Sequence, residues 1–370
     1  MIIKKGNTLD VIKNVYFKRS EPVSIVHFLT NRCNARCSFC FIDFDNPETF
    51  KSELNLNEIE KLTKSFGKSL LNVNFTGGEP FARKEFLDIA KMYSNNTNIQ
   101  SIYITTNGSL PDRIIDFAKK MHLHDNSLEQ TFQISIDNLP EEHNKVRKIK
   151  GLFDSCYDVF HKLKKIENNI NPVVCITVTI ENSDSIKDIY NQFVNKYNFN
   201  SIKCIAVRDE GVYKTPKHLK QKIFDAYKWL SEKIEEDSKK GILQNYNTKT
   251  LQGRLHREKD IIANRMVKKM YMKPKYISPC HAGSLFGVIT ASGDVFPCEI
   301  LEDKLISNLR EFDMNFTDLW QSQKKEDIKN SILKNKCNCT YECALSYNIL
   351  SNWRYQPSLI SAALSFTSEF

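Results

Sequence analysis

Residues 24–40 read SIVHFLTNRCNARCSFC, a short apolar run that leads directly into three cysteines. The run Ser24–Thr30 is rich in β-branched and aromatic residues, which predicts a strand. Cys33, Cys37 and Cys40 then follow on one short loop. A closed structural metal site takes four ligands, so three thiolates indicate a site with an open position. An iron–sulfur cluster fits this pattern, whereas a zinc knuckle or chance spacing is the alternative.

The composition sets broad limits on the class of protein. The chain has 370 residues, of which 41% are hydrophobic and 26% are charged, as in globular proteins. No apolar stretch approaches the ~20 residues of a membrane-spanning helix, and the first residues, MIIKKGNTLD, lack the apolar segment of a signal peptide. We therefore expect a cytoplasmic protein without membrane contact, whose 11 cysteines are ligands or buried thiols.

The net charge of +9 is spread along the chain and no basic helix with interleaved aromatic residues stands out. Nucleic-acid binding is therefore not expected. Mild basicity is compatible with an anionic substrate, although solvated surface charge explains it equally well.

Short apolar runs alternate with helical periodicity through the first half of the chain. The predicted strands are residues 24–30, 71–76, 101–105, 131–137, 173–180 and 201–207. Strands separated by helices predict a parallel sheet with right-handed crossovers. Six strands are too few for an eight-stranded barrel, so we expect an α/β fold, a partial (β/α)6 barrel resembling a TIM barrel. Functional loops in such barrels leave the carboxyl ends of the strands.

Gly77-Gly78-Glu79-Pro80 follows the second predicted strand. Two glycines permit a tight turn and close approach of the backbone to a ligand. Backbone carbonyls and the Glu79 carboxylate are suitable acceptors for a primary ammonium group. The alternative is an ordinary strand-to-helix turn that Pro80 opens.

The three-cysteine loop and this segment about 40 residues later together resemble the signature of the radical S-adenosylmethionine (SAM) enzymes. The resemblance implies that Cys33, Cys37 and Cys40 hold a [4Fe–4S] cluster, with SAM on its open iron. It also implies that Gly77–Pro80 holds the methionine ammonium group. Enzymes of this family take an electron from an external one-electron donor of the flavodoxin or ferredoxin type.

Other positions near predicted strand ends extend the resemblance. Ser135 and Arg147 have the separation of a family pair that contacts SAM. Arg147 can pair bidentately with the methionine carboxylate, and Ser135 can hydrogen-bond to the ribose or carboxylate, although a surface salt bridge is the alternative for Arg147. Asn107 and Asp137 can bind or simply cap turns. Phe39 occupies a position where the family often places an aromatic ring against the adenine, and loop packing is its alternative.

A second group of cysteines lies in the last third of the chain. Cys280 and Cys298 flank a predicted hairpin with its turn at Ala291-Ser-Gly293. Three more cysteines, at 337, 339 and 343, follow downstream. Spacing alone indicates a metal site, for which zinc is the alternative to an iron–sulfur cluster.

This second group resembles the auxiliary-cluster module called SPASM, or its shorter form, twitch. The downstream run has fewer cysteines than a full SPASM domain, so we predict one auxiliary [4Fe–4S] cluster. Cys280, Cys298 and Cys343 match the first auxiliary site of the family. The spacing does not choose between Cys337 and Cys339 for the fourth ligand.

The resemblance implies reductive cleavage of SAM to methionine and a 5′-deoxyadenosyl radical, which abstracts a hydrogen atom from an unactivated carbon. The auxiliary cluster could then accept the electron left on the substrate, or bind the substrate at a vacant iron. Glu299, directly after Cys298, is the candidate general base. An exposed strand glutamate is the alternative for this residue.

Only about 23 residues precede the first predicted strand, fewer than the peptide-recognition domain that peptide-modifying family members often carry. We therefore expect oxidation of a small molecule, such as a sugar or aminocyclitol. A peptide or protein side chain is the alternative substrate. A zinc-binding or electron-carrier protein without SAM chemistry is the alternative of another class.

These features divide the chain into four predicted segments. They are a radical SAM partial barrel (20–215), a helical connector (216–276), a SPASM- or twitch-like domain (277–348) and a C-terminal tail (349–370).

Overall fold

The computed structural model describes residues 8–50, 52–246 and 250–364. The strands are β1 (Ser24–Thr30), β2 (Asn72–Gly77), β3 (Ser101–Thr106), β4 (Glu129–Ser135), β5 (Ile170–Val178), β6 (Ile202–Ala206), β7 (Phe286–Ile289), β8 (Asp294–Phe296) and β9 (Ser307–Asn308). The helices are α1 (Thr8–Lys13), α2 (Leu56–Lys64), α3 (Phe86–Asn96), α4 (Pro111–His124), α5 (Pro140–Arg147), α6 (Leu152–Leu163), α7 (Ile186–Asn195), α8 (Lys220–Lys239), α9 (Leu251–Met270), α10 (Phe316–Trp320), α11 (Gln323–Lys334), α12 (Glu342–Leu350) and α13 (Gln356–Leu364).

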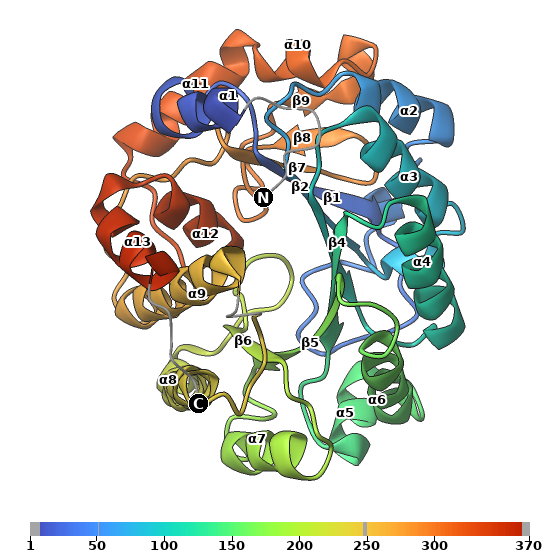
Figure 1. Ribbon diagram of the computed structural model, residues 1–370, viewed down its shortest axis with the longest axis vertical. Helices are drawn as coiled ribbons and strands as arrows, with labels where there is room; N and C mark the ends of the chain where they lie inside the picture. Colours follow the sequence, from blue (N-terminus) through green and yellow to red (C-terminus); the bar gives the residue numbers. More distant parts are fainter. Residues whose placement is uncertain (1–7, 51, 247–249, 365–370) are drawn as a thin grey trace.

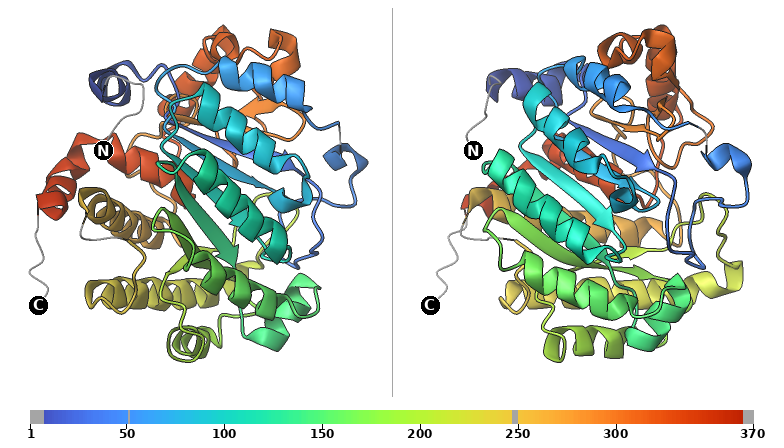
Figure 2. Two further views of the ribbon diagram at one scale, coloured as in Figure 1. Left: turned by 45° about the vertical axis from the view of Figure 1, so that its right-hand side comes forward. Right: turned by 90° about the vertical axis from the view of Figure 1, so that its right-hand side faces the viewer.

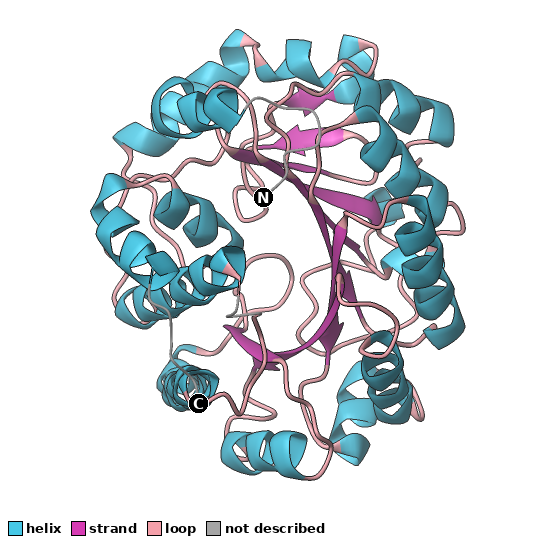
Figure 3. Ribbon diagram, in the orientation of Figure 1, coloured by secondary structure: helices cyan, strands magenta, loops and turns pink. Residues whose placement is uncertain are grey.

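The strands form one sheet in the order β6-β5-β4-β3-β2-β1-β7-β8-β9. Strands β1 to β6 are all parallel, each paired with its neighbour along the chain. Figure 3 shows the sheet as a continuous arc with helices outside it. This confirms the predicted α/β fold, a partial (β/α)6 barrel.

The outer side of the sheet carries the main apolar core. Alternate residues of β2, β3 and β4 are buried, and they face the helices. Phe75 of β2 lies against Phe86 of α3 (ring centroids 5.2 Å apart), and Phe132 of β4 against Phe117 of α4 (6.2 Å). Figure 2 shows α3 and α4 side by side over these strands. The remaining alternate residues are half-buried and therefore face the concave side.

The open side of the partial barrel is covered by helices from the C-terminal third. Helix α9 packs against α12 and α13, on the far side of the arc from α3 and α4 (Figure 1). Tyr347 of α12 interacts with Ser24 of β1 and Asn74 of β2, so α12 reaches the concave face of the sheet. Lys203 of β6 pairs with Asp260 of α9 at 2.8 Å, which joins α9 to the edge of the sheet.

The predicted hairpin is present and joins the barrel sheet. Strands β7 and β8 are antiparallel, and the turn between them contains Gly293 with φ +89°. Strand β7 also pairs in parallel with β1, from Ser24 opposite Phe286 to His27 opposite Ile289. The boundary predicted near residue 277 therefore does not divide the sheet, since the hairpin continues it.

The predicted connector, residues 216–276, contains α8 and α9. Exposed ion pairs link the two helices, including Arg265 with Glu235 at 2.7 Å. Residues 247–249 of this segment and 365–370 of the predicted tail lie outside the described residues. Within the described part of the chain, no helix is both long enough and apolar enough to cross a bilayer.

Candidate functional site

The first cysteine group, Cys33, Cys37 and Cys40, lies on the loop after β1, and all three thiols are half-buried. Burial raises the pKa of Cys33 to about 11 and also raises the pKa of Cys37 and Cys40. Each thiol interacts with at least one other of the group, which adds to the cost of ionising all three. Nearby positive charge would therefore favour the thiolates, and a metal cluster supplies such charge.

The glycines after β2 bring the backbone against the start of the cysteine loop. The Gly78 amide donates to the Thr30 carbonyl (2.7 Å), and the Glu79 amide donates to the Arg32 carbonyl (2.9 Å). A Cβ on Gly77, whose φ is +140°, would lie 2.1 Å from the Thr30 oxygen, and one on Gly78 would lie 2.3 Å from the Arg32 oxygen. The two glycines therefore let the backbone after β2 pack closely against the start of the cysteine loop.

Pro80 opens a short 3₁₀ helix, Pro80–Ala82, and Glu79 caps it. This is the strand-to-helix turn that the sequence offered as the alternative reading of the segment. The turn is compatible with ligand binding by the backbone of this segment. The helix cap uses the Glu79 side chain, whereas the ligand would use backbone carbonyls.

The Glu79 carboxylate is fully buried and has three protein donors. Oε1 accepts from the Phe81 amide (3.1 Å) and the Thr106 hydroxyl (2.8 Å), and Oε2 accepts from the Asn107 amide (2.7 Å). Burial raises its pKa to about 7, although these donors favour the charged form. The sequence suggested this carboxylate as a partner of the SAM ammonium group. In the structure the carboxylate already joins the ends of β2 and β3 through these donors, and its contact with the ammonium group stays a prediction.

Asn107, at the end of β3, is buried against the first cysteine group. Its Nδ2 lies 3.0 Å from Asn34 Oδ1 and 3.7 Å from the Cys33 sulfur. Its Oδ1 accepts from the Ser109 amide at 2.9 Å, which caps the following turn. Both expected roles, a turn cap and a contact near the site, are therefore compatible in one side chain.

Arg147 already has a carboxylate partner. Its Nη2 and Nε lie 2.6 and 2.8 Å from Asp137 Oδ2, and the exposed fractions of the two side chains are 7% and 4%. The other Asp137 oxygen accepts from the Thr177 amide (2.9 Å), and His143 accepts from the Asp137 amide (3.3 Å). The ion pair is thus buried, not at the surface as the alternative reading had it. Sequence spacing alone did not reveal Asp137 as the partner.

Ser135 and Phe39 lie beside this ion pair. The Ser135 hydroxyl, at the end of β4, is half-buried and makes no hydrogen bond to another described residue. The Arg147 guanidinium lies 5.7 Å from the centroid of the half-buried Phe39 ring. Among the predicted SAM-binding residues, Glu79, Asn107 and Arg147 lie near thiols of the first cysteine group.

The second cysteine group is divided between two environments. Four of its members, at 280, 298, 337 and 339, belong to one apolar cluster with Phe286, Ile332 and Tyr341. Cys343, in the first turn of α12, is exposed and lies outside that cluster.

Glu299 is mostly buried, with 11% of its side chain exposed. Its Oε1 lies 2.8 Å from Arg208 Nη1, and its Oε2 accepts a short hydrogen bond from the Tyr341 hydroxyl. It is therefore not the exposed strand glutamate of the alternative reading. Arg208, from the loop after β6, was not expected to have a role because no motif surrounds it. Its guanidinium also faces the rings of Phe41 (5.5 Å) and Tyr341 (5.0 Å).

No group of three or more metal-ligating side chains converges closely enough to hold a single metal ion, within the residues that the structure describes. A closed zinc site would require such convergence, because all four ligands bind one ion. A [4Fe–4S] cluster binds each cysteine to a different iron, so its thiolates stand farther apart. All-thiol donor sets are compatible with an iron–sulfur cluster and also with zinc.

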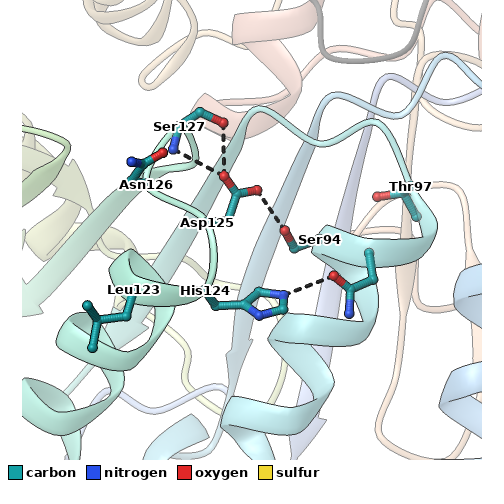
Figure 4. Close-up of a pocket in the computed structure, with 8 residues that line it drawn as sticks. Ser94, Thr97, Leu123, His124, Asp125, Asn126 and Ser127 are labelled. Carbon is teal, nitrogen blue, oxygen red and sulfur yellow. Dashed lines mark hydrogen bonds between the residues drawn. The ribbon is translucent and has the colours of Figure 1, made fainter.

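A surface hollow of about 620 Å³ lies at the end of the barrel opposite to the first cysteine group (Figure 4). Its side chains bond to one another, with His124 at 2.9 Å from Asn95 and Ser94 donating to Asp125 at 2.8 Å. These residues lie at or just after the carboxyl ends of α3 and α4, and the strands that follow begin there. The hollow therefore has no connection with the predicted site.

Residues 28–193 match the family model described as the radical SAM superfamily. This matched stretch, a little under half of the chain, is similar to the radical SAM superfamily. The matched region runs from β1 into α7, so it contains the first cysteine group, Gly77–Pro80, Ser135 and Arg147. The match implies a [4Fe–4S] cluster and SAM as cofactors.

Two curated relatives illustrate the range of the superfamily. GTP 3′,8-cyclase of Actinobacillus pleuropneumoniae serotype 3 (strain JL03) is 29% identical over 147 residues, covering 37% of this chain and 42% of the relative. The sporulation killing factor maturation protein SkfB of Bacillus subtilis (strain 168) is 31% identical over 177 residues, covering 47% and 40%. The chain thus spans about two fifths of the length of these relatives.

Among solved structures, the fold is similar to native anSMEcpe with bound AdoMet and Kp18Cys peptide. The TM-score is 0.62 at 20% identity, over 92% of this chain and 99% of that one. The likeness therefore extends past the family match, through the hairpin and the C-terminal helices.

Proposed function

We propose that this radical SAM enzyme oxidises a small polar molecule, such as a sugar or aminocyclitol, at a site between its two cysteine groups. Arg208 carries the proposal because it contacts residues next to both groups. Phe41 directly follows the last cysteine of the first group, and Glu299 directly follows a cysteine of the second. Tyr341, the third neighbour of Arg208, lies between two further cysteines of the second group.

When bound, the cluster and SAM supply a 5′-deoxyadenosyl radical that abstracts a hydrogen atom, and an auxiliary cluster supplies an electron acceptor. Cys33, Cys37 and Cys40 hold the first cluster in this proposal. The backbone of Gly77–Pro80 accepts from the ammonium group of SAM, while the buried Glu79 carboxylate positions that segment through Thr106 and Asn107.

Ser135 and Arg147 face the remainder of SAM. The free Ser135 hydroxyl can donate to the ribose or the methionine carboxylate. Arg147 has five N–H donors, so its pairing with Asp137 leaves further donors for a second carboxylate. Phe39, next to Arg147, is placed to pack against the adenine.

The oxidation removes one hydrogen atom, one electron and one proton from the substrate, and Glu299 is the proton acceptor we assign. Its carboxylate is ion-paired with Arg208 at 2.8 Å. Tyr341 donates to the other oxygen and so fixes the orientation of the carboxylate. Arg208 and Tyr341 each occupy one oxygen of the Glu299 carboxylate. A substrate proton must therefore reach an oxygen that already accepts a hydrogen bond.

The concave face of the barrel favours a polar substrate. Its half-buried strand positions include Asn74, Tyr103, Gln133 and Ser135, which carry hydrogen-bonding side chains. Tyr103 donates to Gln133 at 2.8 Å, so part of this capacity is used internally. A molecule rich in hydroxyl or amino groups would find partners along these strand ends.

A peptide or protein side chain is the second candidate substrate. It is supported by the relative named as a maturation protein and by the similar structure that holds a peptide. An external flavodoxin- or ferredoxin-type donor is required in either case, and a cytoplasmic location stays a prediction.

Isotope transfer tests the proposal and separates the two substrate classes. Anaerobically purified, reduced enzyme would be incubated with SAM and perdeuterated aminocyclitols and sugars, or with deuterated peptides. We expect deuterium in 5′-deoxyadenosine from the first set, and loss of product formation in Glu299→Gln with deuterium transfer retained. Transfer only from peptides would support the second candidate, and zinc in place of iron would refute both.

A further inference from the structure

We propose that Cys280, Cys298, Cys337 and Cys339 are the four ligands of the auxiliary cluster, and that Cys343 is not a ligand. The inference rests on the proposed function, which includes that cluster. It differs from the expectation drawn from the family resemblance, in which Cys343 was a ligand and only one of the neighbouring pair, 337 or 339, completed the site.

The first observation is that these four thiols share one environment. They belong to a single apolar cluster, built by the hairpin, the carboxyl end of α11 and the start of α12. Cys280 and Cys298 are 6% and 3% exposed. The backbone at Cys337 closes α11 by donating to the Ile332 carbonyl at 3.1 Å, which turns the next residues toward the hairpin.

The second observation is that the four side chains interact with one another. The Cys280 and Cys337 thiols are hydrogen-bonded. Cys298 interacts electrostatically with Cys280 and Cys339, and Cys337 interacts with all three of the others. Each member of the set therefore lies near at least two other members, as ligands of one cluster must.

The third observation is that Cys343 lies beside the residues around Glu299. Its thiol interacts with Glu299, Tyr341, Arg208 and Glu342. It is exposed, whereas the two residues after it in α12, Ala344 and Leu345, are buried.

Helical geometry explains why Cys343 departs from the cluster. Residues 343 and 347 are one turn apart and share a face of α12. Tyr347 interacts with Ser24 and Asn74 on the concave face of the sheet. Cys343 therefore lies on the face of α12 that is directed toward the barrel, beside Arg208 and Glu299.

A functional consequence follows from the number of ligands. Four thiolates occupy one position on each of four irons, so no iron stays free to bind a substrate. The auxiliary cluster would then transfer electrons and not coordinate the substrate. The thiol at 343 would stand near the substrate as a separate group.

Iron content of cysteine variants tests this ligand set. The background is the full chain with Cys33, Cys37 and Cys40 all changed to alanine, so that only the auxiliary site can bind iron. We expect about four irons per chain in this background. Adding Cys280→Ala, Cys298→Ala, Cys337→Ala or Cys339→Ala should lower iron and sulfide content by half or more, together with the visible absorption of the cluster. Adding Cys343→Ala should leave all three unchanged.

Cys204→Ala, at a buried cysteine of β6, is the matched control and should also retain iron. Circular dichroism would establish that each variant is folded, and Cys343→Ser would replace Cys343→Ala if the latter were not. Loss of iron in both Cys343 variants with retention in Cys337→Ala or Cys339→Ala would overturn the ligand set alone. Absence of iron from the folded background variant would overturn the auxiliary cluster of the proposed function, and the ligand set with it.

Discussion

At the scale of single residues, buried polar side chains organise the site more than exposed ones do. Arg147 and Glu79 both lie beneath the first cysteine group, and each is bonded to protein partners. Burial makes these bonds obligatory, since an unpaired buried charge costs several kcal/mol. These two residues, which we propose to lie at the SAM site, are therefore held in place by the protein itself.

Arg147→Met should destabilise the fold strongly. The substitution leaves the buried Asp137 carboxylate without its cation, which costs about 3–5 kcal/mol. Lys120→Met is the control, because Lys120 forms an exposed pair with Asp116 at 2.8 Å and its loss should cost at most about 1 kcal/mol. Urea unfolding would measure both free energies, and equal effects would contradict the argument.

Glu79 should give the protein a specific pH dependence. Burial raises its pKa from 4.5 to about 7, so between these values the folded chain keeps a proton that the unfolded chain releases. The contribution of Glu79 to stability is therefore fully present below about pH 4.5 and declines as pH rises to about 7, by about 3 kcal/mol. The Glu79→Gln side chain cannot titrate. From pH 5 to pH 8, the free energy of unfolding of the wild type should therefore fall relative to that of the variant. Parallel pH profiles in urea unfolding would show that this carboxyl does not titrate as described.

At the scale of elements, the junction of β1 and β2 determines the geometry of the cysteine loop. The amides of Gly78 and Glu79 donate to the carbonyls of Thr30 and Arg32, and the approach at Gly77 and Gly78 leaves no room for a side chain. Strand β1 also receives β7 on its other edge. The first cysteine group is thus attached to an inner strand of the sheet, which has partners on both edges.

Gly77→Ala should disturb this junction far more than a comparable change elsewhere. The new Cβ would lie 2.1 Å from the Thr30 carbonyl oxygen, at a φ of +140°, and we expect a loss of about 3 kcal/mol or more. Gly151→Ala also introduces a side chain at positive φ (+71°), but nothing lies within 4 Å, so it should cost about 1 kcal/mol. Iron content should fall only in the Gly77 variant. Similar losses in both variants would mean that backbone conformation alone decides the effect.

At the scale of the whole molecule, the hairpin and the barrel form one body. Strand β7 pairs with β1, and Val26, Phe28 and Val288 from the two strands form a shared apolar cluster. Helix α12 links the second cysteine group to the concave face of the same sheet. The two cysteine groups are therefore joined through one continuous sheet.

Hydrogen exchange should therefore show one cooperative unit. Peptides from β4–β5 and from β7–β8 should lose protection over the same range of urea concentration, because the continuous sheet couples their opening. Mass spectrometry resolves the two regions in a single sample of wild-type protein. Earlier exchange in the hairpin peptides would indicate that the C-terminal region unfolds independently.

Local sequence determined the strands, their parallel order and the positions of the chemical motifs. Apolar alternation, glycine turns and cysteine spacing are properties of neighbouring residues, so the sequence shows them without the fold. Gly77–Pro80, Ser135 and Arg147 therefore appeared at the correct edge of the sheet before any contact was known.

Only the tertiary structure decided which partners these residues take. Thr106 donates to Glu79 across 27 positions of the chain, and Arg208 pairs with Glu299 across 91 positions. Strand β7 pairs with β1 across more than 200 positions. Ion pairs and sheet edges depend on proximity in space, which no local pattern records. For the same reason the spacing of the second cysteine group left its fourth ligand open, whereas packing separates Cys343 from the other four.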